Sequence, residues 1–64
     1  MSPWLVTWMD AGVVKQFVMP SCYFYNLSSE ICAYGVHSVE MVLRVEKISE
    51  MEYQMRRNVM ESLP

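Results

Sequence analysis

The residues best suited to metal or thiol chemistry are the two cysteines and the single histidine, Cys22, Cys32 and His37. Their Cys-x9-Cys-x4-His spacing lacks the close cysteine pairs of structural zinc sites and supplies only three soft ligands. If both cysteines lie on one helix, their Cα atoms are about 15 Å apart, which is too far for a disulfide. The sequence therefore predicts no metal site, no cofactor and two free thiols, which are typical of a reducing compartment.

Catalytic chemistry has few candidate residues in this chain. It requires a nucleophile with a base in reach, or paired carboxylates in contrasting environments. The chain has one His and one Asp, and a predicted turn already accounts for Asp10. The two glycines, Gly12 and Gly35, are too few for a phosphate-binding loop. We therefore expect a noncatalytic protein that has no small-molecule substrate.

Length and composition predict a single small domain over residues 1–64. Of the 64 residues, 53% are hydrophobic, although a chain this short buries only about 60% of the surface it exposes when unfolded. The net charge of −2 gives little support for nucleic-acid binding. The longest segment without a charged residue, 16–29, contains Pro20. We therefore expect neither a signal peptide nor a membrane span, and a cytoplasmic location.

A β-hairpin is predicted over residues 4–19. The segment Asp-Ala-Gly at 10–12 suits a three-residue loop, which pairs Leu5 with Phe17. Because side chains alternate across a sheet, the hairpin has two faces. The face assigned to the core comprises Trp4, Val6, Trp8, Val14, Gln16 and Val18. The other face, which is unusually apolar for a free surface, comprises Leu5, Thr7, Met9, Val13, Lys15, Phe17 and Met19.

An amphipathic helix is predicted over residues 22–34, after Pro20 has ended the second strand. Weak helix formers in its first half leave a second option, an irregular segment followed by a helix from about Ser28. Gly35 is expected to end the helix in the left-handed conformation. The apolar stripe of this helix comprises Tyr23, Phe24, Leu27, Ile31 and Tyr34.

A third strand is predicted over residues 36–47, and a second helix begins at Ser49. Glu52 completes a capping box with Ser49, and Ile48 can pack against Tyr53. The apolar face of the strand comprises Val39, Met41, Leu43 and Val45. If this strand pairs with the first, the fold class is α+β with the order β-β-α-β-α. It then has a three-stranded antiparallel sheet in the order 2-1-3 and two helices.

A partner-binding surface is predicted on two parts of the chain. On the second helix, Met51, Met55 and Val59 form a stripe that we assign to the core. The opposite face combines Tyr, Met and Arg, residue types that are enriched at protein interfaces. Together with the more apolar sheet face, it gives a predicted partner-binding set of Tyr53, Arg56, Arg57, Met60, Leu5, Met9, Lys15 and Phe17.

The hairpin sequence at residues 6–17, followed by a helix and a single strand, resembles the β-β-α-β layout of very small phage and prophage accessory proteins. These include anti-CRISPR proteins and inhibitors of host polymerase. The resemblance covers residues 4–46 through the pattern of elements alone. It implies a stoichiometric inhibitor in the host cytoplasm that occupies a surface of a host protein complex. The near-neutral charge departs from the strongly acidic members that mimic nucleic acid.

We therefore expect a noncatalytic protein-binding module, a small phage-type inhibitor that blocks a host protein complex. Two alternatives stay open. The first is a homo-oligomeric structural or regulatory subunit, with a homodimer as its simplest form. The second, which the charge disfavours, is a nucleic-acid-binding protein.

Overall fold

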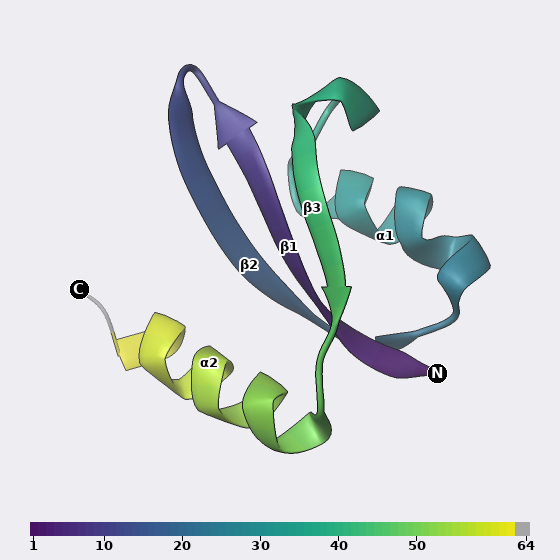
Figure 1. Ribbon diagram of the computed structural model, residues 1–64, viewed down its shortest axis with the longest axis vertical. Helices are drawn as coiled ribbons and strands as arrows, with labels where there is room; N and C mark the ends of the chain where they lie inside the picture. Colours follow the sequence, from purple (N-terminus) through teal and green to yellow (C-terminus); the bar gives the residue numbers. More distant parts are fainter. Residues whose placement is uncertain (63–64) are drawn as a thin grey trace.

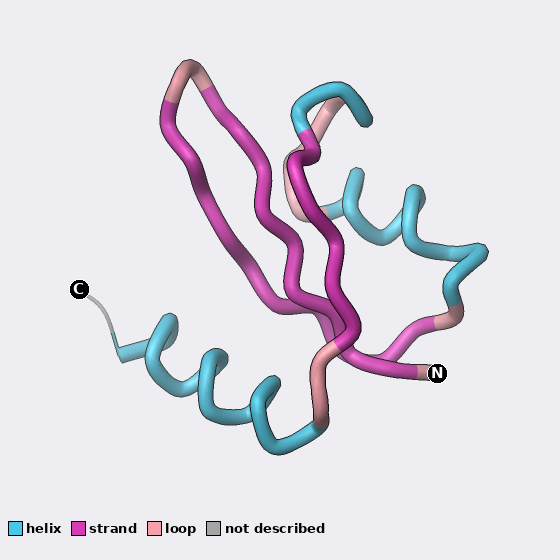
Figure 2. The backbone as a smooth tube through the Cα atoms, viewed as in Figure 1, coloured by secondary structure: helices cyan, strands magenta, loops and turns pink. Residues whose placement is uncertain are grey.

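Residues 1–62, which the computed structural model describes, form three strands and two helices in the predicted order β-β-α-β-α (Figure 1). Side chains are described as far as Val59. The strands β1 (Ser2–Asp10), β2 (Val13–Cys22) and β3 (Val42–Lys47) pair antiparallel in the order β2-β1-β3, which confirms the predicted α+β fold class. The helices are α1 (Leu27–Ala33) and α2 (Glu50–Ser62). Two short 3-10 turns, η1 (Phe24–Asn26) and η2 (Val39–Met41), precede α1 and β3 (Figure 2).

The turn between β1 and β2 is one residue shorter than predicted. Asp10 pairs directly with Val13, and the two residues between them, Ala11 and Gly12, have positive φ angles of 50° and 81°. Positive φ at both positions defines a type I′ turn, whose twist matches that of a hairpin. The predicted three-residue loop is therefore wrong.

This one-residue difference moves every side chain of β2 to the opposite face of the sheet. Val6 pairs with Phe17, and Leu5 pairs with Val18. The predicted faces are therefore correct within β1 but wrong for β2. The residues that change face are Val13, Val14, Lys15, Gln16, Phe17, Val18 and Met19.

The helix α1 covers the sheet face that carries Trp4 and Val6. Ile31 from α1 and Val36 from the following loop are buried against these two side chains and Met19. Partly buried side chains surround this cluster, namely Trp8, Phe17, Cys22, Leu27, Met41, Val42 and Val45. The first buried cluster therefore joins α1 to all three strands.

The boundaries of α1 confirm the shorter of the two predicted helices. Pro20 does not end β2, because it lies on an edge strand beside an irregularity in the pairing, where a missing N–H group is tolerated. The strand continues to Cys22, and α1 begins at Leu27. Gly35 has a φ of 100° and its N–H donates to the carbonyl of Cys32 at 3.0 Å, as expected for a left-handed helix end.

The helix α2 covers the opposite face of the sheet. A second buried cluster, formed by Leu5, Val18, Ile48 and Tyr53, joins α2 to β1 and β2. The Oγ of Ser49 accepts the backbone N–H of Glu52 at 3.1 Å, which confirms the predicted start of the helix. The N–H of Ile48 donates to the carbonyl of Pro3 at 3.1 Å. The first bond caps α2, and the second attaches Ile48, which precedes the helix, to β1.

The orientation of α2 about its own axis is opposite to the predicted one. Tyr53 is buried, with 8% of its surface exposed, whereas Met51, Met55 and Val59 are 75%, 62% and 61% exposed. The predicted assignment of these three residues to the core is therefore wrong. Tyr53 faces the sheet because it packs with Ile48, which the bond to Pro3 holds against β1.

The third strand begins later than predicted, because its first residues form η2. Its pairing with β1 shifts between Thr7 and Trp8, which leaves Leu43 as an extra, bulged residue. Val45 packs on the α1 side of the sheet, as predicted. Leu43 and Val39 are exposed, contrary to the prediction, because the bulge and η2 interrupt the alternation of faces.

The two-residue turn predicts that Ala11→Asn stabilises the protein. An L-residue with left-handed φ is strained by roughly 1 to 2 kcal/mol, whereas Asn-Gly is a preferred type I′ pair. The free energy of unfolding should rise by roughly 0.5 to 1 kcal/mol in urea denaturation. Gly12→Ala should lower it, because that position also has positive φ. If Ala11→Asn left the free energy of unfolding unchanged, the result would instead indicate a three-residue loop, in which residue 11 has negative φ.

The orientation of α2 predicts unequal effects of truncation at two positions of the same helix. Tyr53→Ala removes a buried ring and should lower the free energy of unfolding by about 3 kcal/mol or more. Met55→Ala removes an exposed side chain and should change it by less than about 0.5 kcal/mol. Thermal melts followed by circular dichroism measure both variants. Equal losses at the two positions would contradict the observed orientation.

Candidate functional site

The two cysteines lie on different elements. Cys22 is half-buried at the end of β2, and Cys32 is exposed on α1; both are free thiols. The expectation that one helix carries both is wrong, because β2 extends to Cys22. Among residues 1–62, no three His, Cys, Asp or Glu side chains are grouped closely enough to hold a metal ion.

Tyr34, at the end of α1, carries a phenol group that stays protonated at neutral pH. Burial raises the pKa of its phenol above the ordinary value, and the nearby Tyr53 and Glu30 raise it further. Its ring stacks on Phe17, with the ring centroids 4.8 Å apart and the planes at 12°. Tyr34 therefore acts as a packing residue at the end of α1.

Three of the predicted partner-binding residues pack inside the protein. Leu5 and Tyr53 are buried together between the sheet and α2. Phe17 lies on the opposite face, half-buried beside Tyr34. The assignment of Leu5 and Tyr53 to a partner surface is wrong, because α2 covers Leu5 and turns Tyr53 toward the sheet. Phe17 lies on the other face because the register of β2 differs from the predicted one.

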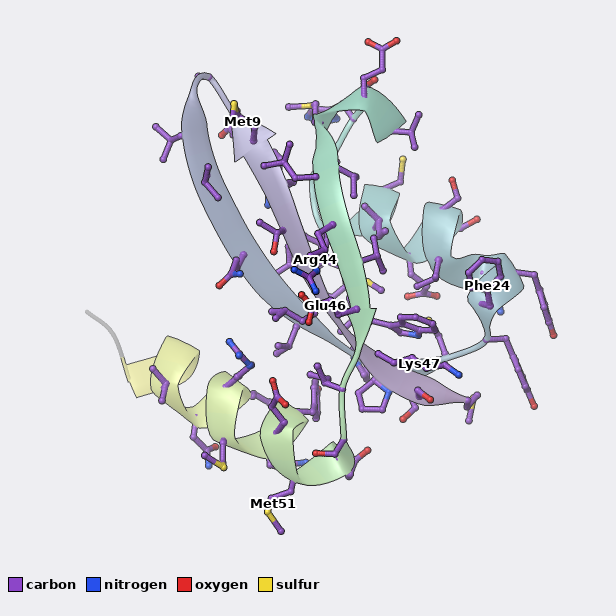
Figure 3. All side chains as sticks on the ribbon, viewed as in Figure 1. Met9, Phe24, Arg44, Glu46, Lys47 and Met51 are labelled. Carbon is purple, nitrogen blue, oxygen red and sulfur yellow. The ribbon has the colours of Figure 1, made fainter. Side chains whose placement is uncertain are left out.

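Two more predicted residues lie near the hairpin tip, on opposite faces of the sheet. The Nζ of Lys15 forms an ion pair with Asp10 at 2.8 Å and lies 5.7 Å from the centre of the Trp8 ring. Met9, which Figure 3 labels beside the tip, pairs with Val14 on the other face. Lys15 shares the α1 face with Phe17, and Met9 shares the α2 face with Leu5, so the predicted residues are divided between the two faces of the sheet.

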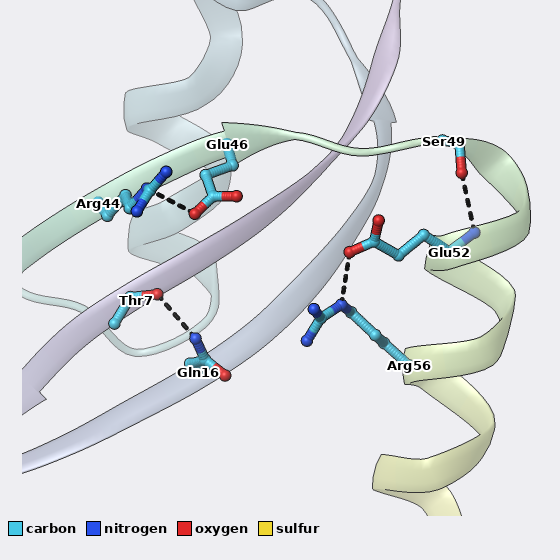
Figure 4. A network of polar contacts seen from close by, with 7 residues as sticks. All are labelled: Thr7, Gln16, Arg44, Glu46, Ser49, Glu52 and Arg56. Carbon is cyan, nitrogen blue, oxygen red and sulfur yellow. Dashed lines mark hydrogen bonds and ion pairs between the residues drawn. The ribbon is translucent and has the colours of Figure 1, made fainter.

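The predicted residues on α2 are divided between an intrahelical ion pair and positions near the helix end. The Nε of Arg56 donates to the carboxylate of Glu52 at 2.8 Å, as the i, i+4 spacing predicts (Figure 4). Arg57 is exposed. The side chain of Met60 lies outside the described residues.

Polar side chains on the α2 face of the sheet, beyond the helix itself, pair with one another. The Nε2 of Gln16 donates to the Oγ1 of Thr7 at 3.0 Å, and Arg44 forms an ion pair with Glu46 (Figure 4). Polar groups satisfied in this way are typical of an ordinary solvent-exposed sheet face. The candidate surfaces therefore lie elsewhere.

The first candidate surface is an aromatic patch formed by Tyr23, Phe24 and Tyr25, which are 50%, 76% and 77% exposed. The chain leaves β2 at Cys22 and turns through η1, where the N–H of Asn26 donates to the carbonyl of Tyr23 at 2.9 Å. The backbone is extended at Tyr23, and the 3-10 turn begins at Phe24. This arrangement leaves all three consecutive rings exposed.

The rings of the aromatic patch contact one another and the core. Tyr23 and Tyr25 stack, with their centroids 5.3 Å apart and their planes at 6°. The ring centroids of Phe24 and Trp4 are 6.3 Å apart, and the Nε1 of Trp4 donates to the carbonyl of Cys22 at 3.2 Å. The patch is therefore held against a buried tryptophan, which reduces the entropy that its rings would lose on binding.

An open groove of about 280 Å³ lies beside the aromatic patch. Among the described residues that line it, Lys47 is the only one with a charged side chain. The lining comprises Met1, Ser2, Trp4, Cys22, Tyr23, Phe24, Tyr25 and Lys47. The groove thus combines aromatic faces with a basic side chain.

Sequence reasoning missed the aromatic patch because it assigned these residues to a helix from residue 22. Within a helix, Tyr23 and Phe24 fall on or near the stripe of Leu27 and Ile31, which predicts that they are buried. The run of three consecutive aromatic residues was the available signal. At about 100° per residue, three such residues span too wide an arc for all of them to face one sheet.

The second candidate surface is a methionine stripe on α2, formed by Met51, Met55 and Val59. It lies opposite Tyr53 and points away from the sheet, as Figure 3 shows for Met51. Ser49, Glu52 and Arg56 line a shallow groove together with the two methionines. Exposed methionine is adaptable, because its unbranched side chain conforms to varied contact surfaces.

Among residues 1–62, no helix has the length and apolar character needed to cross a membrane. The chain matches no protein-family model, and neither a curated protein nor a solved structure is significantly similar to it.

Proposed function

We propose that this chain is a noncatalytic protein-binding module that engages its partner through the aromatic patch. The observation that carries the proposal is the contiguous exposure of Tyr23, Phe24 and Tyr25. Burying one Phe side chain contributes roughly 1.5 to 3 kcal/mol, which a chain of 64 residues needs for its own stability. Isolated exposed apolar residues are ordinary, whereas contiguous ones mark interaction surfaces.

The chemistry of the groove indicates what kind of partner fits. Ring faces accept apolar and aromatic side chains, and the phenol groups of Tyr23 and Tyr25 add hydrogen bonding at their edges. Lys47, the charged residue of the described lining, favours a carboxylate beside the apolar contact. We therefore infer a partner segment that combines apolar side chains with an acidic residue.

The mode of action that we propose is stoichiometric inhibition of a host protein complex, as for phage-type inhibitors of the anti-CRISPR kind. The order of elements supports it, together with the exposed aromatic patch. Two free thiols fit a cytoplasmic location. Occupying a surface of a larger complex requires no chemistry beyond contact.

Replacing two rings of the patch tests this function. Phe24→Ser with Tyr25→Ser should weaken capture of the partner from a cell extract by about tenfold or more, because aromatic residues dominate interface energies. The circular dichroism spectrum should stay unchanged, since both side chains are largely exposed. Quantitative mass spectrometry of the captured proteins measures the effect.

The matched control is Val13→Thr with Val14→Thr, which removes apolar surface that is 57% exposed at each position of the hairpin tip. This variant should capture the partner as well as the unmodified chain does. Equal capture by all three proteins would contradict the assignment to the aromatic patch. Binding to DNA or RNA that weakens steeply with salt would favour base stacking on the same rings instead.

A further inference from the structure

The methionine stripe runs along the outer surface of α2 with a spacing of four residues. Met51 and Met55 are 75% and 62% exposed, and Val59 continues the stripe toward the C-terminal end of the helix. At about 100° per residue, the stripe is centred on Met55 and lies on the side opposite Tyr53. The sheet already contacts the Tyr53 side, so this outer side is available for a further contact.

The flank of the stripe that carries Glu52 and Arg56 has opposite charges at its two ends. Glu52 lies toward the beginning of α2 and Arg56 lies one turn later, joined by the 2.8 Å ion pair. Both side chains are partly exposed, so their remaining hydrogen-bonding groups are accessible. The other flank carries Gln54 and Asn58, which are uncharged.

We propose that α2 packs antiparallel against α2 of a second copy of this chain, with the two-fold axis near Met55. This axis places Met51 of one copy against Val59 of the other, so both stripes are buried along one seam. A two-fold interface brings the same patch of both copies together, so each charged flank meets the same flank of the second copy. Glu52 then lies within about 3 Å, measured along the helix axis, of Arg56 of the second copy.

The charges select the antiparallel arrangement and identify a second copy as the occupant. Each copy supplies one acid and one base to this flank, so four charges alternate in sign around the axis. A parallel pair would place Glu52 and Arg56 against Gln54 and Asn58, and would align the two helix dipoles unfavourably. Only in the antiparallel pair does this flank meet opposite charges on the same flank of the second copy.

The expected dimer is weak, because its seam is a single helix of 13 residues. Interfaces smaller than the standard size of about 800 Å² per partner are typical of weak or transient association. The aromatic patch contacts Trp4 on the α1 side of the sheet, away from this seam. Self-association is thus independent of the proposed partner binding, and either one can fail without the other.

Sedimentation velocity over concentrations from roughly 10 µM to 1 mM tests the dimer. The unmodified chain should shift from monomer to dimer over this range. Met51→Gln with Met55→Gln keeps side-chain length and helix propensity, and should raise the dissociation constant by about tenfold or more. Val13→Thr with Val14→Thr is the control and should leave the dissociation constant unchanged. A monomer at every concentration, or a dimer insensitive to the methionine substitutions, would overturn the proposal.

Disulfide trapping tests the direction of packing. In a Cys22→Ser, Cys32→Ser background, Met55→Cys lies near the axis and should form a covalent dimer on oxidation. Met51→Cys should do so much more slowly, because its two copies are about 12 Å apart along the axis in the antiparallel pair. In a parallel pair both variants cross-link alike, so equal rates would overturn the proposed arrangement.

The charged flank makes a separate prediction for mixtures of two variants. Glu52→Arg alone and Arg56→Glu alone each place like charges together across the axis, so each should dimerise more weakly than the unmodified chain. Mixing the two variants restores opposite charges at both contacts and should restore the dimer. A mixture that associates no better than either variant alone would contradict the role of this flank.

Discussion

The structure depends on the burial of β1 on both of its faces at once. Trp4 and Val6 are buried beneath α1, while Leu5, which lies between them in the sequence, is buried beneath α2. One short segment of the central strand therefore supplies both apolar clusters. Because the two helices meet the sheet at this segment, the outer half of the hairpin keeps Val13 and Val14 exposed. The small size of the chain thus determines which surfaces stay uncovered.

The order of the elements and the arrangement of the sheet could be predicted because each rests on a local signal. Ser49 begins α2 through its own side chain, and Gly35 ends the turn after α1 through its positive φ. The hairpin register has no such signal. An Asp-Ala-Gly segment suits a three-residue loop with one left-handed residue, and local preference disfavours a left-handed Ala11. The structure accepts this strain, and the resulting register places Phe17 with Val6 and Val18 with Leu5.

The orientation of α2 could not be predicted from periodicity alone, because the helix has two apolar sides. Counting apolar residues favours Met51, Met55 and Val59 as the buried side. The anchoring of Ile48 to β1 decides otherwise, since Tyr53 must follow Ile48 onto the sheet. The contact between Ile48 and Tyr53 across the helix start therefore predicts the buried side of α2 correctly, whereas the longer apolar stripe does not. The aromatic patch was not predicted for a related reason: β2 extends to Cys22, and a 3-10 turn at Phe24–Asn26 takes the place of the first turn of the predicted helix.

The two exposed apolar surfaces belong to different sides of the sheet, and this separation has a functional consequence. The aromatic patch is held by Trp4 on the α1 side, whereas the methionine stripe points outward from α2. A second copy bound along α2 therefore leaves both aromatic patches accessible. A partner that carries two copies of the recognised segment would then bind a dimer more tightly than two separate monomers, because the second contact becomes intramolecular. Weak self-association and modest contact with a partner can in this way combine into tight binding, provided that the spacing of the two segments matches that of the two patches.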